Sequence, residues 1–200
     1  MLPEPHRRPA ALDPLENTRA KKERIAPAMA VENLQITPIE ERDREWVNEI
    51  THQRWGAEYV VVHGAVYFPW KLKGFLARND LEEKLGFITY TLDGPDCEII
   101  TLDSIVESQG VGRELLARVI RKAEQADCSR VHLTTTNDNQ RGIAFYRRNG
   151  FRLAAVHPGA VERARKLKPS IPMLSPTGIP IRDELEFELL LPGKEKRAQQ

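Results

Sequence analysis

A glycine-rich turn joins a strand-like segment to a helix-like segment near the middle of the chain. It reads Glu107-Ser-Gln-Gly-Val-Gly-Arg113, with Gly110 and Gly112 at its centre. Glycine lets the backbone approach a ligand closely, and the first amides of a helix lack internal partners and lie at the positive end of its dipole. The turn therefore predicts a diphosphate site made of main-chain N–H groups, with a plain tight turn as the alternative. It matches neither the Walker nor the dinucleotide-binding spacing.

Basic residues gather in the same half of the chain. Residues 111–170 hold 13 Lys/Arg and five Asp/Glu, although the net charge of the whole chain is only +1. Such a surplus favours a polyanionic ligand near the turn, while a solvated basic surface explains the charges equally well. Few aromatic residues and no nucleic-acid motif accompany it, so we expect no nucleic-acid partner.

Composition limits the class of protein. The chain has 200 residues, of which 40% are hydrophobic and 30% charged, which predicts one domain with a real core. No segment approaches the ~18 apolar residues of a membrane helix, and the N-terminus lacks the apolar core of a secretory signal. We therefore expect a cytoplasmic protein that does not bind a membrane. Cys97 and Cys128 are the only cysteines and lack metal-site spacing, so we expect no metal.

The two ends of the chain differ from its middle. Residues 1–30 contain five prolines, no glycine and no aromatic residue, which leaves too little apolar area to offset chain entropy. We expect 1–33 to be a disordered or loosely docked extension, 34–192 to be the folded domain, and 193–200 to be a flexible tail.

The hydrophobic pattern predicts how the middle of the chain folds. A turn signal, Asp93-Gly-Pro-Asp96, joins two strands tightly and so predicts an antiparallel pair, whereas a strand, a helix and a strand predict a parallel pair. Strands are expected over 34–38, 59–67, 74–77, 84–92, 98–106, 130–136, 151–156 and 184–191, and helices over 41–55, 111–123 and 140–149. The expected fold is α/β, a mixed and mostly antiparallel sheet of six to seven strands with helices on both faces.

A second motif follows the strand over 130–136. It comprises Asn139, Gly142, Phe145, Tyr146, Gly150 and Phe151. Together with the glycine turn it resembles the GNAT N-acetyltransferase superfamily. That family carries Q/R-x-x-G-x-G/A after its fourth strand and N-x-x-A-x-x-F/L-Y-x-x-x-G-F after its fifth. Glu107 and Gly142 depart from these patterns. A narrower likeness is to bacterial members with LTTTNDN, LKPSIP and GIPIRDE segments, all of which this chain contains.

The resemblance implies a binding site for acetyl-CoA. In the family the fourth and fifth strands, here 98–106 and 130–136, splay apart and hold the cosubstrate between them. The pantetheine amides would pair with the main chain of the fourth strand, and the pyrophosphate with the N–H groups of the glycine turn. The implied cofactor-binding residues are Ser104, Ile105, Val106, Gln109, Gly110, Val111, Gly112, Arg113, Glu114, Asn139 and Tyr146.

The resemblance also implies catalytic residues. Tyr146 lies at the position of the family's general acid to the CoA sulfur, although an aromatic residue packed in the core is the alternative. Glu98 lies where some members carry a catalytic glutamate, and Asp103 is the second candidate for the base. Strand alternation predicts Glu98 and Asp103 on opposite faces. On an apolar face desolvation would raise the pKa of a carboxylate, which suits a base near neutral pH. A solvated charge, or an ordered water as the base, is the alternative.

Other polar residues have weaker assignments. We expect Asn139 to cap its helix and contact CoA, and His132 to be structural. His52, Arg54 and two proline-rich loops, Lys168–Pro172 and Gly178–Glu184, form either an acceptor pocket or a packing or homodimer contact.

The sequence therefore predicts an acetyl-CoA-dependent N-acyltransferase. It would move an acetyl group directly to a primary amine within a ternary complex, with no metal and no covalent enzyme intermediate. The alternative is a non-catalytic module that binds or senses acyl-CoA on the same fold. The acceptor is not predicted, because family resemblance concerns the donor site.

Overall fold

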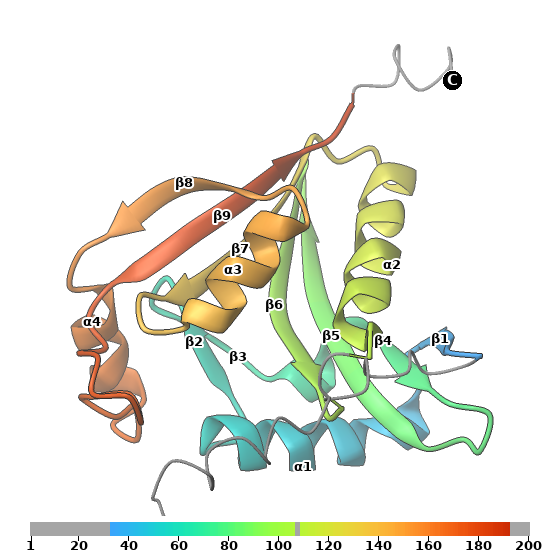
Figure 1. Cartoon of the computed structure of the whole chain (residues 1–200), viewed down its shortest axis with the longest axis horizontal. Coiled ribbons are helices and arrows are strands. Elements are labelled where there is room, and N and C mark those ends of the chain that lie inside the picture. The colour runs from blue at the N-terminus through green and yellow to red at the C-terminus, as the bar shows by residue number, and fades with distance from the viewer. Residues whose placement is uncertain (1–32, 107–108, 193–200) are drawn as a thin grey trace, which may run out of the picture.

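The structure is a computed structural model that describes residues 33–106 and 109–192. One seven-stranded sheet runs through it in the order β1-β4-β5-β6-β7-β9-β8 (Figure 1). Only the β6–β7 pair of this sheet is parallel, so the expected mixed and mostly antiparallel α/β sheet is confirmed. The strands are β1 (Gln35–Pro38), β4 (Lys73–Arg78), β5 (Lys84–Asp93), β6 (Asp96–Ser104), β7 (Arg130–Thr136), β8 (Arg152–His157) and β9 (Glu184–Leu190).

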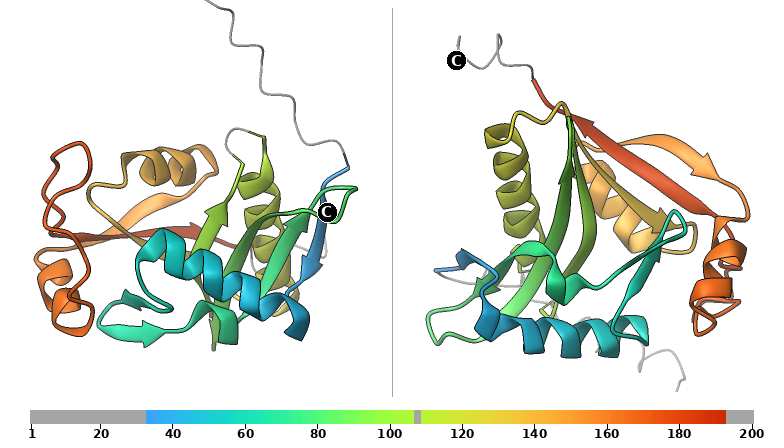
Figure 2. Two further views of the ribbon diagram at one scale, coloured as in Figure 1. Left: turned by 90° about the horizontal axis from the view of Figure 1, so that it is seen from below. Right: turned by 180° about the vertical axis from the view of Figure 1, so that it is seen from behind.

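Helices cover both faces of the sheet, as expected (Figure 2). Helices α2 and α3 pack on one face around a large core that includes Leu115 and Ile143. Helix α1 packs on the other face, where Val47, Leu76 and Phe87 form a smaller core. The helices are α1 (Arg44–Trp55), α2 (Val111–Gln125), α3 (Gln140–Arg148) and α4 (Ala160–Leu167), with 3-10 turns at Glu41–Asp43 and Pro69–Lys71.

Some expectations differ from what is observed. The segment 59–67 forms a separate hairpin of β2 (Val60–Val62) and β3 (Ala65–Tyr67). Helix α4 covers 163–167, where a surface helix end was one explanation of the basic charges. The predicted tail, and the predicted extension except Asn33, lie outside the described residues. Within the described ranges, no helix is long and apolar enough to cross a bilayer.

Strands β6 and β7 separate part of the way along their length. Their pairing covers four residue pairs, from Asp96 with Arg130 to Ile99 with Leu133. Beyond that point β6 continues to Ser104 and β7 to Thr136 without pairing to each other. The result is the V-shaped opening between β6 and β7 in Figure 1, which confirms the expected splay. Each strand therefore turns an edge of main-chain groups toward the V, where a ligand can pair with it.

A β-bulge in β6 changes which residues share a face. Tyr90 of β5 pairs with Ile99, but Thr89 pairs with Thr101, so one extra residue, Ile100, lies in β6. Residues 87, 89 and 91 of β5 share a face. Their partners Asp103, Thr101 and Glu98 must therefore share it too, and it is the face covered by α1 because Phe87 packs there. The prediction that Glu98 and Asp103 lie on opposite faces was wrong, because the bulge interrupts the alternation.

A buried ion pair fixes the start of α1 against the sheet. The Asp43 carboxylate accepts a hydrogen bond from Arg78 on β4 at 2.6 Å and lies 3.3 Å from the Lys84 ammonium. Burial alone would raise the pKa of Asp43, but the hydrogen bonds from the Glu40 amide, Arg78 and Lys84 outweigh it and lower the pKa. At its other end, α1 brings Trp55 to β6, where the indole N–H donates to Asp103 at 3.0 Å.

Candidate functional site

Helix α2 begins shortly after the end of β6, the strand that forms one side of the V. Gly110 precedes the helix with a φ of 85°, a left-handed conformation that favours glycine. None of the described residues accepts a hydrogen bond from the amides of Val111, Gly112 or Arg113. The amide of Glu114 differs, because it donates to the carbonyl of Gly110 at 3.1 Å. Among the residues that the structure describes, these three successive N–H groups have no partner, and they lie at the positive end of the helix, where an anion is favoured.

Gly112 has room for a methyl group among the described residues. A Cβ atom built there would meet only the Phe145 ring, at 3.6 Å, which is an ordinary van der Waals contact. Packing therefore does not require glycine at this position. A ligand passing between α2 and α3 would make use of the same space, which gives the glycine a reason other than folding.

Two of the predicted strand contacts are already engaged within the protein. The amide of Ile105 donates to the carbonyl of Leu85 at 2.8 Å, and the Ser104 hydroxyl donates to the carbonyl of Val106. A ligand could bind the Ile105 amide or the Ser104 hydroxyl only by replacing these protein carbonyls as the acceptor. Glu107, which replaces the family's Gln or Arg, lies outside the described residues, and Gln109 lies half-buried beside Gly110.

Tyr146 of α3 combines a packed ring with an unpaired hydroxyl. Its ring contacts Phe145, Phe151 and Phe187, so the expectation of core packing holds for the ring. A tyrosine that only fills the core usually has a hydrogen-bond partner for its hydroxyl. No described residue forms a hydrogen bond with the Tyr146 hydroxyl. Burial and the charge of Asp103 raise the pKa of Tyr146. The group therefore stays protonated near neutral pH, as an acid must.

The two candidate bases differ in their environment. Burial raises the pKa of Glu98, and the nearby charge of Glu186 raises it further. Burial also raises the pKa of Asp103, while the hydrogen bond from Trp55 opposes this rise. One oxygen of Asp103 is thus occupied, whereas no described residue forms a hydrogen bond with Glu98. Among the described residues, both oxygens of Glu98 and one oxygen of Asp103 are therefore without a hydrogen bond, which favours Glu98 as the base.

Asn139 caps α3, and both the oxygen and the nitrogen of its side-chain amide form hydrogen bonds. Its Oδ1 accepts from the amide of Gly142 at 2.9 Å, and its Nδ2 donates to the Thr135 hydroxyl at 2.9 Å. A Cβ atom on residue 142 would collide with the Asn139 side chain. In its present orientation the Asn139 side chain is therefore compatible with glycine at residue 142 and not with alanine.

The proline-rich loops are held by internal hydrogen bonds. Asn137, which follows β7, donates to the carbonyl of Pro180 and accepts from the amides of Arg182 and Asp183. The Arg165 guanidinium of α4 donates to three carbonyls in the same region, those of Ile171, Pro172 and Ile181. The LTTTNDN, LKPSIP and GIPIRDE segments therefore form one packed unit, which favours the packing interpretation of the loops.

Sequence reasoning missed a cluster of imidazoles and carboxylates. His63 of the β2–β3 turn, His157 of β8 and Glu186 of β9 come together on the face of the sheet that carries Glu98. His132 lies 3.9 Å from Glu186, and its Nδ1 is enclosed without a hydrogen-bond partner. No spacing along the chain links these positions, because different strands carry them.

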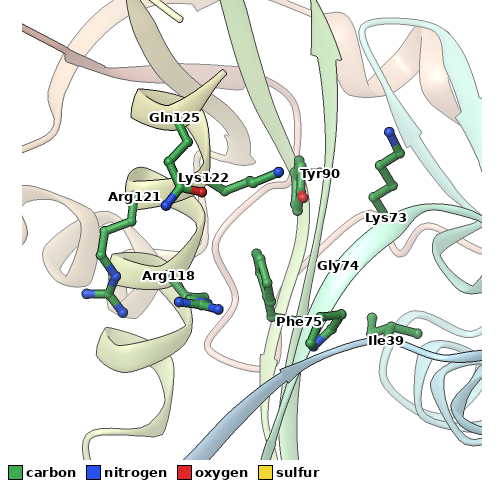
Figure 3. Close-up of a pocket in the computed structure, with 10 residues that line it drawn as sticks. Ile39, Lys73, Gly74, Phe75, Tyr90, Arg118, Arg121, Lys122 and Gln125 are labelled. Atoms are coloured by element: carbon green, nitrogen blue, oxygen red, sulfur yellow. The ribbon is translucent and has the colours of Figure 1, made fainter. Parts of the chain in front are cut away.

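A cavity of about 330 Å³ lies on the other flank of α2 (Figure 3). Phe75 and Tyr90 form part of its wall. The basic residues that line it are Lys73, Arg118, Arg121 and Lys122. Much of the positive charge of α2 therefore faces β4 and β5 rather than the V, so the surplus of basic residues is weak support for a phosphate site at the glycine turn.

Comparisons with known proteins agree with this architecture. A model described as the acetyltransferase (GNAT) family matches residues 38–151. The Bacillus subtilis protein YdhI is 44% identical over 156 residues, covering 78% of this chain and 98% of YdhI. Among solved structures, an IAA acetyltransferase from Bacillus cereus aligns with a TM-score of 0.61 at 18% identity, covering 80% of this chain and all of the other. A GNAT acetyltransferase from Elizabethkingia anophelis with acetyl-CoA bound aligns with a TM-score of 0.57 at 20% identity, covering 80% and 99%.

Proposed function

Because the chain belongs to the GNAT acetyltransferase family, we propose that it is an enzyme that transfers the acetyl group of acetyl-CoA directly to a primary amine. The observation that carries this proposal is the set of amides at the start of α2 that no described residue pairs with, next to the strands β6 and β7 that separate into the V. The amides can donate hydrogen bonds to a diphosphate. The edge of β6 can pair with the amides of an extended ligand such as the pantetheine arm.

In the proposed complex the donor lies in the V. The amides of Val111, Gly112 and Arg113 bind the pyrophosphate, and the unpaired edge of β6 pairs with the pantetheine arm. A free main-chain N–H at the splay donates to the thioester carbonyl, where negative charge develops as the amine attacks. The neighbour from Elizabethkingia anophelis, which was solved with acetyl-CoA, supports the choice of cosubstrate.

Proton transfer is assigned to Glu98, on the last part of β6 that pairs with β7, and to Tyr146 of α3. The Glu98 carboxylate takes a proton from the attacking amine, whose nitrogen forms a bond to the acetyl carbon. The carbon–sulfur bond then breaks, and the Tyr146 hydroxyl gives its proton to the leaving sulfur. The products are an N-acetylated amine and free CoA. No intermediate is bonded to the protein.

Calorimetric titration of the full chain with acetyl-CoA, paired with detection of released thiol over a panel of primary amines, tests the proposal. We expect 1:1 binding and amine-dependent thiol release. No binding at millimolar acetyl-CoA would overturn the proposal as a whole. Binding without release, over amino acids, polyamines, aminoglycosides and peptides, would favour a module that senses acyl-CoA.

We expect Glu98→Gln to lower kcat/KM by about 100-fold at neutral pH, the lower end for general-base catalysis, because water can take the proton instead. Since the pKa of Glu98 is raised, the base is protonated at low pH, and activity of the unmodified chain should increase as pH rises through that pKa. The variant should lack this increase in a pH profile of kcat/KM.

Asp103→Asn is the matched control, because it removes a second carboxylate of the same face. It should keep the pH-dependent increase. If Asp103→Asn lost the increase and Glu98→Gln retained it, the base would be Asp103.

A further inference from the structure

The β2–β3 turn holds a histidine in an unusual backbone conformation. His63 has a φ of 48° and Gly64 a φ of 77°, as in a two-residue turn where asparagine and glycine are favoured. A histidine in the left-handed region costs free energy, and contacts of its side chain offset that cost here. Its imidazole lies over the sheet, where Nε2 is 2.8 Å from the Thr134 hydroxyl and Nδ1 is 3.2 Å from Glu184.

Three possible ligand atoms converge below this turn. The Nε2 atoms of His157 and His63 lie 3.3 Å and 4.0 Å from Oε2 of Glu186. One such atom from each residue lies within 4.8 Å of the others. An ion about 2.0–2.2 Å from each ligand in a tetrahedral site separates neighbouring ligand atoms by about 3.3–3.6 Å. The separation between His157 and Glu186 fits this range, whereas the His63 imidazole must move closer and exchange its contact with the Thr134 hydroxyl for the ion.

Two carboxylates, those of Glu184 and Glu186, lie next to these imidazoles. Glu184 is only 4% exposed, and its Oε2 accepts no hydrogen bond of good geometry although His63 Nδ1 lies 3.2 Å away. A carboxylate facing the second nitrogen of a histidine ligand fixes the orientation and tautomer of that ligand. Arg130 holds the other oxygen of Glu186 at 3.2 Å, which leaves Oε2 for the imidazoles.

Space for a further ligand exists next to these groups. A cavity of about 300 Å³ is lined by His63, His157 and Glu184, with Arg163 of α4 also on its wall. Arg130 and Arg163 oppose a cation, while Glu98, Glu184 and Glu186 favour one. An ion with three protein ligands would keep a position open toward this cavity, as in catalytic rather than structural sites.

We propose that His63, His157 and Glu186 bind one divalent transition-metal ion of the zinc class, with Glu184 orienting His63. Two imidazoles and one carboxylate suit zinc, cobalt or nickel better than magnesium or calcium, which prefer oxygen ligands alone. The ion would tie the β2–β3 hairpin to β8 and β9. The sequence expectation of no metal considered the cysteines, whereas these ligands meet only in the folded chain.

The test uses untagged full-length protein freed of metal with a chelator and titrated with Zn²⁺ by calorimetry and with Co²⁺ by visible absorption. We expect 1:1 binding, a cobalt ligand-field band and no response to Mg²⁺. At Zn²⁺ about 100-fold above Kd, the Tm should rise by about 5 to 10 °C. No 1:1 binding of either ion would overturn the proposal.

Variants identify the ligands. His157→Gln should weaken Zn²⁺ binding at least 100-fold, and Glu184→Gln should weaken it about 10- to 100-fold as an orienting residue. His52→Gln is the matched control, because His52 is exposed on α1 and outside the cluster, and it should bind as the unmodified chain does. Unchanged binding by a folded His157→Gln protein would also overturn the assignment. Circular dichroism of each variant checks that it is folded.

Discussion

Tyr146→Phe is expected to lower kcat by about 1,000-fold while the Kd for acetyl-CoA changes little. The substitution removes only the hydroxyl, and the ring keeps its contacts with Phe145, Phe151 and Phe187. General acids contribute about 10² to 10⁴ to rate, and their loss affects the transition state rather than the bound donor. Steady-state kinetics gives kcat, and calorimetry on the same preparation gives the Kd for acetyl-CoA.

Tyr90→Phe is the matched control for this prediction. Tyr90 is buried, stacks on Phe75 and lies in β5, outside the V. Its substitution should leave kcat within about twofold. If Tyr146→Phe retained full kcat, Tyr146 would be a core aromatic and the thiolate would leave without an acid. If Kd and Tm changed together with kcat, its role would be structural.

A second large effect is expected at the start of α2. Gly112→Asp should weaken acetyl-CoA binding by about 1,000-fold, because the new carboxylate faces a diphosphate and like charges brought together cost several kcal/mol. Folding should be affected little. The Cβ atom meets only Phe145 at ordinary contact distance, and an acidic residue in the first turn of a helix interacts favourably with its dipole.

Gly112→Asn is the control that separates the effect of charge from the effect of size, because the asparagine and aspartate side chains have nearly the same shape. It should weaken binding by about tenfold, and the remaining difference measures the charge. Thermal unfolding of both variants should resemble that of the unmodified chain. Equal affinities of Asp and Asn variants would contradict a diphosphate at the α2 N-terminus, and a large fall in Tm would mean that glycine serves packing after all.

The sequence was most informative where structure depends on local pattern. The helix over α2 could be predicted because Val111, Leu115 and Val119 repeat on one face, and all three are buried. Gly110 and the Asn139 cap also follow local rules: Gly110 has the left-handed backbone expected of glycine before a helix, and Asn139 caps α3. Relations between strands could be predicted where a short turn joins them, as between β5 and β6, or where a helix connects them, as between the parallel strands β6 and β7.

Features that depend on strand register could not be predicted. The bulge at Ile100 adds one residue to β6, and nothing in its apolar sequence distinguishes it from a regular strand. It places Glu98 and Asp103 on one face against the simple alternation. The imidazole cluster was missed for a related reason, because the turn at His63 meets β8 and β9 only through tertiary packing.

The contact between Asn139 and Gly142 has an evolutionary consequence. The cap amide occupies the volume that a methyl group on residue 142 would need. A methyl group on residue 142 would require the Asn139 side chain to shift from its present position, which would alter the hydrogen bond that caps α3. The absence of a side chain at residue 142 is thus tied to the geometry of this cap. Homologues should be compared for this pair of positions rather than for either residue separately.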